Sequence, residues 1–138
     1  MRTHPIRAKI PLDGIRVLVV EDDYFIADEI CSTLREHGAE IVGPSPDVEH
    51  GLQMVRSNDI DCAVLDINLQ GDYAFGIASE LRQRGTPAIF ATGYDVSVLP
   101  GEFSDSIRLE KPVNLQALLQ AVQAACGRRQ ALTSEQES

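Results

Sequence analysis

The sequence contains no tryptophan, and no stretch of it approaches the ~20 consecutive apolar residues of a membrane-spanning helix. Its N-terminal segment carries Arg2, Arg7 and Lys9, but Pro5 and Pro11 leave no apolar core of the kind found in signal peptides. We therefore expect a cytoplasmic protein that does not enter a membrane.

Cysteine and positive charge are also scarce. The cysteines Cys31, Cys62 and Cys126 each lie within an apolar pattern and show no metal-ligand spacing, which indicates reduced thiols. Twelve Lys and Arg residues stand against 21 Asp and Glu residues, giving a formal net charge of −9. This balance argues against direct binding to nucleic acid or to an anionic membrane.

The chain of 138 residues is long enough for one domain with a substantial core and too short for two. Its apolar fraction of 43% and charged fraction of 24% are ordinary for a globular protein. We expect an N-terminal arm at 1–13, one folded domain at 14–127, and a flexible polar tail at 128–138.

Buried apolar runs alternate with segments of helical period along this domain. The runs predict strands at 15–20, 39–42, 62–66, 88–91 and 107–109. Helical stripes follow each strand except the fourth, where residues 95–106 are irregular and contain Pro100 and Gly101. The alternation predicts an α/β fold, with a doubly wound five-stranded parallel sheet between two layers of helices.

Local signals place the helix ends. Gly38 is expected to stop the first helix, and Ser45 to cap the second, with Pro46 as its first residue. Asn114 is expected to cap the last helix, and Gly127 to end it.

Acidic side chains follow two of the predicted strands. Asp66 ends the strand at 62–66, and Glu21, Asp22 and Asp23 follow the strand at 15–20. In an open parallel sheet, functional groups gather at the carboxyl ends of the strands. Two carboxylates ~4 Å apart repel by about 4 kcal/mol at an effective dielectric of 20, so such a cluster needs a cation. Oxygen ligands favour Mg²⁺.

Two further side chains occupy strand ends. Thr92 follows the fourth strand, and Lys111 follows the fifth and precedes Pro112, a position where the peptide bond can be cis. Together with the acids they form a chemically coherent set: a carboxylate attacks a phosphoryl group, while a cation, an ammonium and a hydroxyl stabilise its oxygens.

These residues, in this order and spacing, resemble the receiver domain of two-component response regulators over residues 14–127, which implies a flavodoxin-like or CheY-like fold. By that resemblance Asp66 is the phosphoacceptor, Thr92 the conserved hydroxyl and Lys111 the conserved ammonium. Mg²⁺ would be held by carboxylates of Asp22 and Asp66, by the backbone carbonyl of Asn68, and by Glu21 through water. Asp23 fits a helix-start acid better than a ligand.

The resemblance also implies partners. A sensor histidine kinase or a histidine phosphotransfer protein would supply the phosphoryl group, and an unidentified protein would read the phosphorylated state. Homodimerisation is left open. Phe90-Ala-Thr-Gly-Tyr94 further resembles the motif of the "FAT GUY" group of receivers, several of which are associated with general stress signalling.

Some positions depart from the usual receiver pattern. Arg108 occupies the place of the switch aromatic, and Gln70 replaces a proline in the loop after the phosphoacceptor. We expect Arg108 to stay at the surface, because burying an unpaired guanidinium is costly. Tyr94 then becomes either the moving switch group or a fixed lid over the site.

Three alternatives compete with an active receiver. Asp66-Ile-Asn68 partly matches the nucleophile motif of Mg²⁺-dependent haloacid-dehalogenase-type phosphatases, but Asn68 stands in place of their general acid. A flavodoxin-like cofactor binder is disfavoured by the missing tryptophan and by the acids after the first strand. The last alternative is a degenerate receiver that only binds partners. An active receiver is not an enzyme acting on other substrates, because it catalyses only its own phosphorylation and dephosphorylation.

Overall fold

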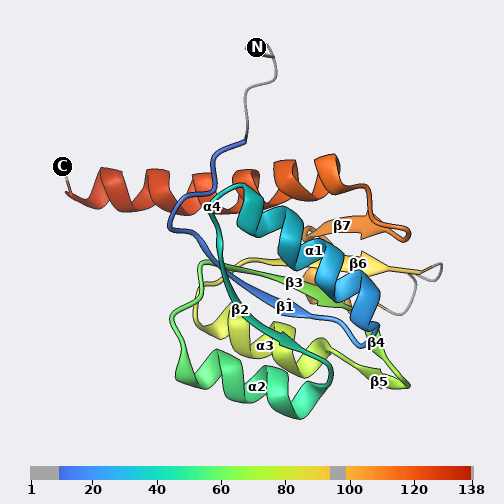
Figure 1. Cartoon of the computed structure of the whole chain (residues 1–138). Helices are drawn as coiled ribbons and strands as arrows, with labels where there is room; N and C mark the ends of the chain where they lie inside the picture. The colour runs from blue at the N-terminus through green and yellow to red at the C-terminus, as the bar shows by residue number, and fades with distance from the viewer. Residues whose placement is uncertain (1–9, 94–98, 138) are drawn as a thin grey trace, which may run out of the picture.

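The computed structural model describes residues 10–93 and 99–137, with side chains as far as Cys126 (Figure 1). Its main sheet has five parallel strands in the order β2-β1-β3-β6-β7, which confirms the predicted fold class. These strands are β1 (Arg16–Val20), β2 (Glu40–Ser45), β3 (Cys62–Asp66), β6 (Ala88–Thr92) and β7 (Ile107–Glu110).

Helices cover both faces of this sheet (Figure 1). Helices α1 (Tyr24–Glu36) and α4 (Leu115–Glu137) lie on one side, and α2 (Val48–Ser57) and α3 (Phe75–Gln83) lie on the other. In the described part of the chain, no helix is long and apolar enough to cross a membrane.

The sheet divides the core into two apolar clusters. One joins Val17, Val19 and Val64 to side chains of α1 and α4, and the other joins Leu18, Leu65 and Phe90 to side chains of α2 and α3. Successive residues of a strand point to opposite faces, so the continuous apolar runs fill both clusters at once. Burial of β3 on both faces fixes where Asp66 emerges.

The second helix begins later than predicted. Ser45 is the last residue of β2, and the Asp47 side chain caps α2 by accepting a hydrogen bond from the His50 N–H at 2.8 Å. Ser45 lies in the pairing register with Val20, and its hydroxyl donates to the Asp47 carbonyl oxygen. Strand pairing therefore outcompetes the local capping signal at Ser45.

Both ends of the domain differ from expectation. Leu12 is fully buried, and its N–H donates to the His37 carbonyl oxygen, so the end of the expected arm belongs to the core. Helix α4 does not end at Gly127 but continues to Glu137. A helical glycine costs only about 1 kcal/mol, and the good helix formers that follow it in the sequence offset that cost.

The irregular segment between β6 and β7 contains a short 3₁₀ turn, η2 (Gly101–Phe103), within its described residues 99–106. Its Phe103 is buried and packs edge-on against Phe90. A two-stranded hairpin, β4 (Asn68–Leu69) and β5 (Asp72–Tyr73), was not predicted and follows Asp66 directly.

Candidate functional site

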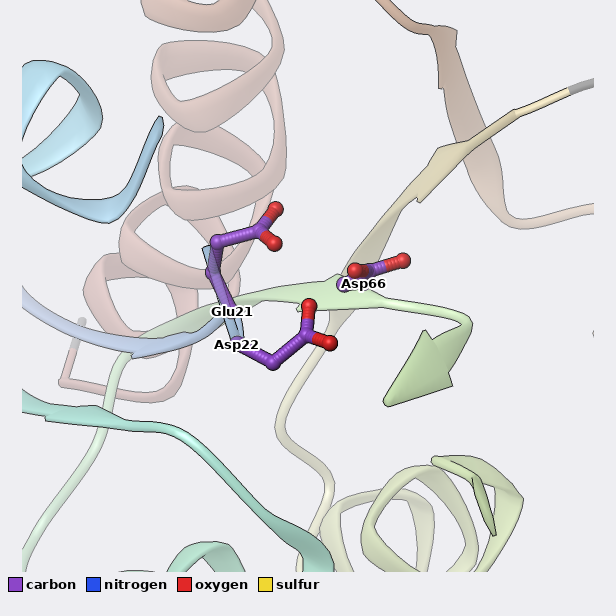
Figure 2. A group of neighbouring side chains, drawn as sticks. All are labelled: Glu21, Asp22 and Asp66. Carbon is purple, nitrogen blue, oxygen red and sulfur yellow. The ribbon is translucent and has the colours of Figure 1, made fainter. Parts of the chain in front are cut away.

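The acidic residues meet because β1 and β3 are parallel neighbours. Val20 pairs with Leu65, so Glu21 and Asp22 leave β1 at the level where Asp66 ends β3. Figure 2 shows the three carboxylate groups turned towards one another. One oxygen of each lies within 4.8 Å of the others, close enough for a single cation to be held between them.

Lys111 completes this cluster from the end of β7. Its Nζ donates a hydrogen bond to Asp66 Oδ2 at 2.9 Å and lies 3.1 Å from Glu21 Oε1. Its backbone N–H donates to the Thr92 carbonyl oxygen at 2.7 Å, and the peptide bond to Pro112 is cis. Burial lowers the pKa of Lys111, but the hydrogen bond and charge of Asp66, with those of Glu21, outweigh it and raise the pKa overall.

Glu21 is the buried acid of the group. Burial raises its pKa from 4.5 to about 7; the Asp23 N–H opposes the rise, the Asp66 charge adds to it, and Lys111 opposes it. Its Oε1 is buried and receives no well-directed hydrogen bond from the described residues, in spite of the nearby Lys111 ammonium. A buried oxygen of this kind, beside two more carboxylates, fits a hard divalent cation such as Mg²⁺.

The hairpin after β3 is built directly on Asp66. The Asn68 N–H donates to Asp66 Oδ1 at 3.2 Å, and the Asn68 side chain in turn accepts from the Gly71 N–H at 2.7 Å. Asn68 and Leu69 pair with Tyr73 and Asp72 across this short turn. The loop after β3 is therefore tied by hydrogen bonds to the Asp66 carboxylate.

These elements enclose an open hollow of about 880 Å³. Its lining brings together five of the predicted site residues: Glu21, Asp22, Asp66, Asn68 and Lys111. Gln70, Gly71 and Gly93 also line it, although they were not predicted to do so. Only pairing of the hairpin brings Gln70 and Gly71 here, and the Gln-Gly pair in the sequence is a weak turn signal.

The other candidate residues lie around this hollow in different ways. Thr92 is buried at the end of β6 and is not among the described residues that line the hollow. Asp23 caps α1, accepting hydrogen bonds from the Phe25 and Ile26 N–H groups, so it acts at the helix start as its position suggested. Arg108 is exposed on β7. Tyr94 lies outside the described residues.

Comparison with known proteins identifies the family. The model of the response regulator receiver domain matches residues 17–123, most of the chain. The chain belongs to the receiver domain family. The acidic hollow formed by Glu21, Asp22 and Asp66 is thus that of a two-component receiver domain.

Among its relatives, this receiver domain is 32% identical over 127 residues to the transcriptional regulatory protein TcrA of Mycobacterium tuberculosis, covering 87% of the chain and 49% of TcrA. It is 27% identical over 123 residues to PdtaR of the same species, covering 86% of the chain and 60% of PdtaR. The chain therefore spans about half to three fifths of the length of these curated relatives.

A solved structure of similar size also matches the receiver domain. SdrG from Sphingomonas melonis Fr1 is 31% identical, with a TM-score of 0.71, and the match covers 80% of the chain and 95% of SdrG. A receiver domain from Francisella is 25% identical, with a TM-score of 0.72, and covers 84% of the chain and 99% of that domain.

Proposed function

We propose that this protein is a single-domain response regulator that accepts a phosphoryl group on Asp66 in a Mg²⁺-dependent reaction. The donor would be a sensor histidine kinase or a histidine phosphotransfer protein. The observation that carries the proposal is the position of the Asp66 carboxylate, between two other acids and 2.9 Å from the Lys111 ammonium, at the wall of an open hollow.

The residues divide the chemistry between them. An Asp66 oxygen attacks phosphorus, the bond from phosphorus to the donor breaks, and its electron pair leaves with the donor. Lys111 neutralises charge that develops on the phosphoryl oxygens, and the Thr92 hydroxyl donates a hydrogen bond to one of them. The protein acts on no other substrate, so it is not an enzyme in the usual sense.

The metal would be held by the carboxylates of Asp22 and Asp66, by the Asn68 backbone carbonyl, and by Glu21 through water. When bound, Mg²⁺ neutralises phosphoryl oxygens and relieves the repulsion within the acidic cluster. The buried Glu21 oxygen without a well-directed donor supports this assignment.

The output is proposed to pass to a protein partner by direct contact, because neither charge nor apolar runs favour nucleic acid or membrane. Phe90-Ala-Thr-Gly93 continuing into Tyr94 supports membership in the FAT GUY group. Tyr94 would serve as the switch or lid, and the exposed position of Arg108 supports a surface role for that residue.

A phosphorylation assay tests the proposal. Incubation with acetyl phosphate and Mg²⁺ should add one phosphoryl group by intact mass. No label should form when a chelator is present during the incubation, and hydroxylamine should remove a label that has formed. Asp66→Asn should remain unlabelled. Asp23→Asn is the matched control, because it removes an adjacent acid yet keeps a side chain that caps α1.

Three results would change the assignment. Normal labelling of Asp66→Asn would place the phosphoryl group elsewhere. A correctly folded wild type that takes no label, yet still binds a partner, would indicate the degenerate receiver instead. Release of phosphate from added phosphomonoesters would favour the phosphatase alternative.

A further inference from the structure

The turn of the β4–β5 hairpin contains an unusual backbone conformation. Gln70 has φ +55°, the only positive φ of a non-glycine residue among the described residues. Gly71, its neighbour in the turn, has φ +98°. A two-residue turn with both φ values positive favours Asn-Gly, and a glutamine at its first position carries a conformational cost that asparagine or glycine would avoid.

The surrounding contacts impose this conformation. Asp66 Oδ1 accepts from the Asn68 N–H, and Asn68 Oδ1 accepts from the Gly71 N–H, so the turn is tied to the carboxylate itself. Strained residues of this kind are concentrated at functional sites, where the surrounding structure enforces them. The backbone strain makes Gln70 a candidate functional residue. Its role is inferred from the side chains that line the hollow.

A water molecule that hydrolyses phospho-Asp66 has to arrive from the open side of the hollow. The inner wall of the hollow is formed by the buried Glu21 and Asp66 and by Lys111, whose ammonium is hydrogen-bonded to Asp66. In-line displacement places the attacking oxygen opposite the leaving carboxylate oxygen, on the solvent side of the phosphoryl group. The group that orients this water must therefore come from the exposed lining.

Among the described residues that line the hollow and are exposed, only Asn68 and Gln70 have a side chain that can both donate and accept hydrogen bonds without carrying charge. Asn68 Oδ1 is already engaged by the Gly71 N–H. The Gln70 amide makes no hydrogen bond within the described residues and is available to a water molecule.

We propose that Gln70 orients the water that hydrolyses the phosphorylated Asp66 and so sets the lifetime of the signal; this rests on the proposed function. The amide oxygen accepts a hydrogen bond from the water, and the amide N–H donates to a phosphoryl oxygen. The water oxygen bonds to phosphorus, and the bond from phosphorus to Asp66 breaks. Its electron pair restores the carboxylate, and dihydrogen phosphate leaves with both protons of the water.

Three variants separate the amide from the backbone strain. Gln70→Gly removes both, Gln70→Met keeps the strain and the approximate shape but removes the amide, and Gln70→Asn relieves the strain and keeps a shorter amide. Each protein is phosphorylated with acetyl phosphate and Mg²⁺, the reagent is removed, and the remaining phosphoprotein is followed by intact mass.

Gln70→Gly and Gln70→Met should both lose the label more slowly, by roughly five- to twentyfold, less than the 100-fold or more typical of proton transfer. Gln70→Asn should recover part of the rate. The Mg²⁺ concentration that gives half the thermal shift should stay within about twofold of wild type, whereas a variant that disturbed the structure of the acidic cluster would change it.

Wild-type decay, or faster decay, in both Gln70→Gly and Gln70→Met would overturn the role of Gln70 and leave Asp66 phosphorylation standing. Slow decay in Gln70→Gly alone would assign the effect to the backbone and also overturn it. If the wild type takes no label at all, the proposed function fails, and the inference fails with it. Hydrolysis in ¹⁸O-water should place the heavy oxygen in phosphate; its appearance in Asp66 would exclude attack at phosphorus.

Discussion

Lys111 Nζ donates a hydrogen bond to Asp66 Oδ2 at 2.9 Å, although the two residues lie 45 positions apart in the chain. The same ammonium lies 3.1 Å from Glu21, so one positive charge partly neutralises two buried carboxylates. Substitutions that change the charges of this site should therefore change the free energy of unfolding.

Lys111→Met should destabilise the metal-free protein by roughly 2–3 kcal/mol, because it leaves the two acids without their counter-ion. The same variant should gain more stability from Mg²⁺ than the wild type does, since the cation then meets a larger uncompensated negative charge. Thermal unfolding with and without Mg²⁺ checks both statements. A smaller Mg²⁺ shift in the variant would contradict the charge argument.

Asp22→Asn should stabilise the metal-free protein by about 1–2 kcal/mol, because it removes one of three carboxylates that repel one another. It should also remove most of the stabilisation by Mg²⁺. Asp23→Asn serves as the control, since it changes the net charge equally but leaves the cluster intact. Equal Mg²⁺ shifts in wild type and Asp22→Asn would place the metal elsewhere.

The raised pKa of Glu21 predicts how the metal-free protein responds to pH. A carboxyl group that ionises at 4.5 when unfolded and at about 7 when folded binds an extra proton in the folded state between these values. Its contribution to stability is therefore fully present below pH 4.5 and is lost as pH rises towards 7, by about 3 kcal/mol at most. In Glu21→Gln this decrease in the free energy of unfolding with rising pH should be absent. Denaturant unfolding of both proteins between pH 5 and 8 measures it.

Leu12→Ala should cost about 2–4 kcal/mol of unfolding free energy, because Leu12 is fully buried in the cluster shared with α1 and α4. Ile10→Ala, at a partly buried position against the same cluster, should cost clearly less. Denaturant titration of both variants provides the comparison. Equal, negligible losses would mean that residues 10–13 do not belong to the domain.

Arg108→Ala should leave phosphorylation unchanged and the free energy of unfolding within about 0.5 kcal/mol of wild type. The reason is that the side chain is exposed on the edge strand β7. Loss of partner binding by the beryllofluoride-loaded variant would then locate part of the output surface on β7. If beryllofluoride-loaded Arg108→Ala still binds the partner and beryllofluoride-loaded Tyr94→Ala does not, the switch is assigned to Tyr94 instead.

The sequence predicted the sheet and the acidic cluster because both depend on short apolar runs with polar residues at their ends. Asp66 is an example: burial of β3 on both faces fixes where it emerges. Ser45 was misplaced because its role depends on pairing with Val20, a contact between residues far apart in the chain. The role of Leu12 was missed for a similar reason, since one apolar residue between Pro11 and Asp13 has no period to interpret.

The hairpin was missed because its turn contradicts the usual preferences. Gln-Gly is a weak signal, and the hydrogen bonds from Gly71 to Asn68 and from Asn68 to Asp66 impose the conformation. Residues with the least predictable local structure thus lie beside the carboxylate at the centre of the site.

The division of the core by the sheet has a practical consequence for the cysteines. Cys31, Cys62 and Cys126 are buried thiols in the same cluster, between the sheet and the helices α1 and α4. Burial also raises the pKa of the Cys31 thiol, which further slows its reaction with alkylating reagents. Alkylation of the native protein therefore requires that layer to open, whereas opening of α2 and α3 alone exposes no thiol. The rate of alkylation therefore reports the opening of the layer formed by α1 and α4, and it does not report the opening of α2 and α3.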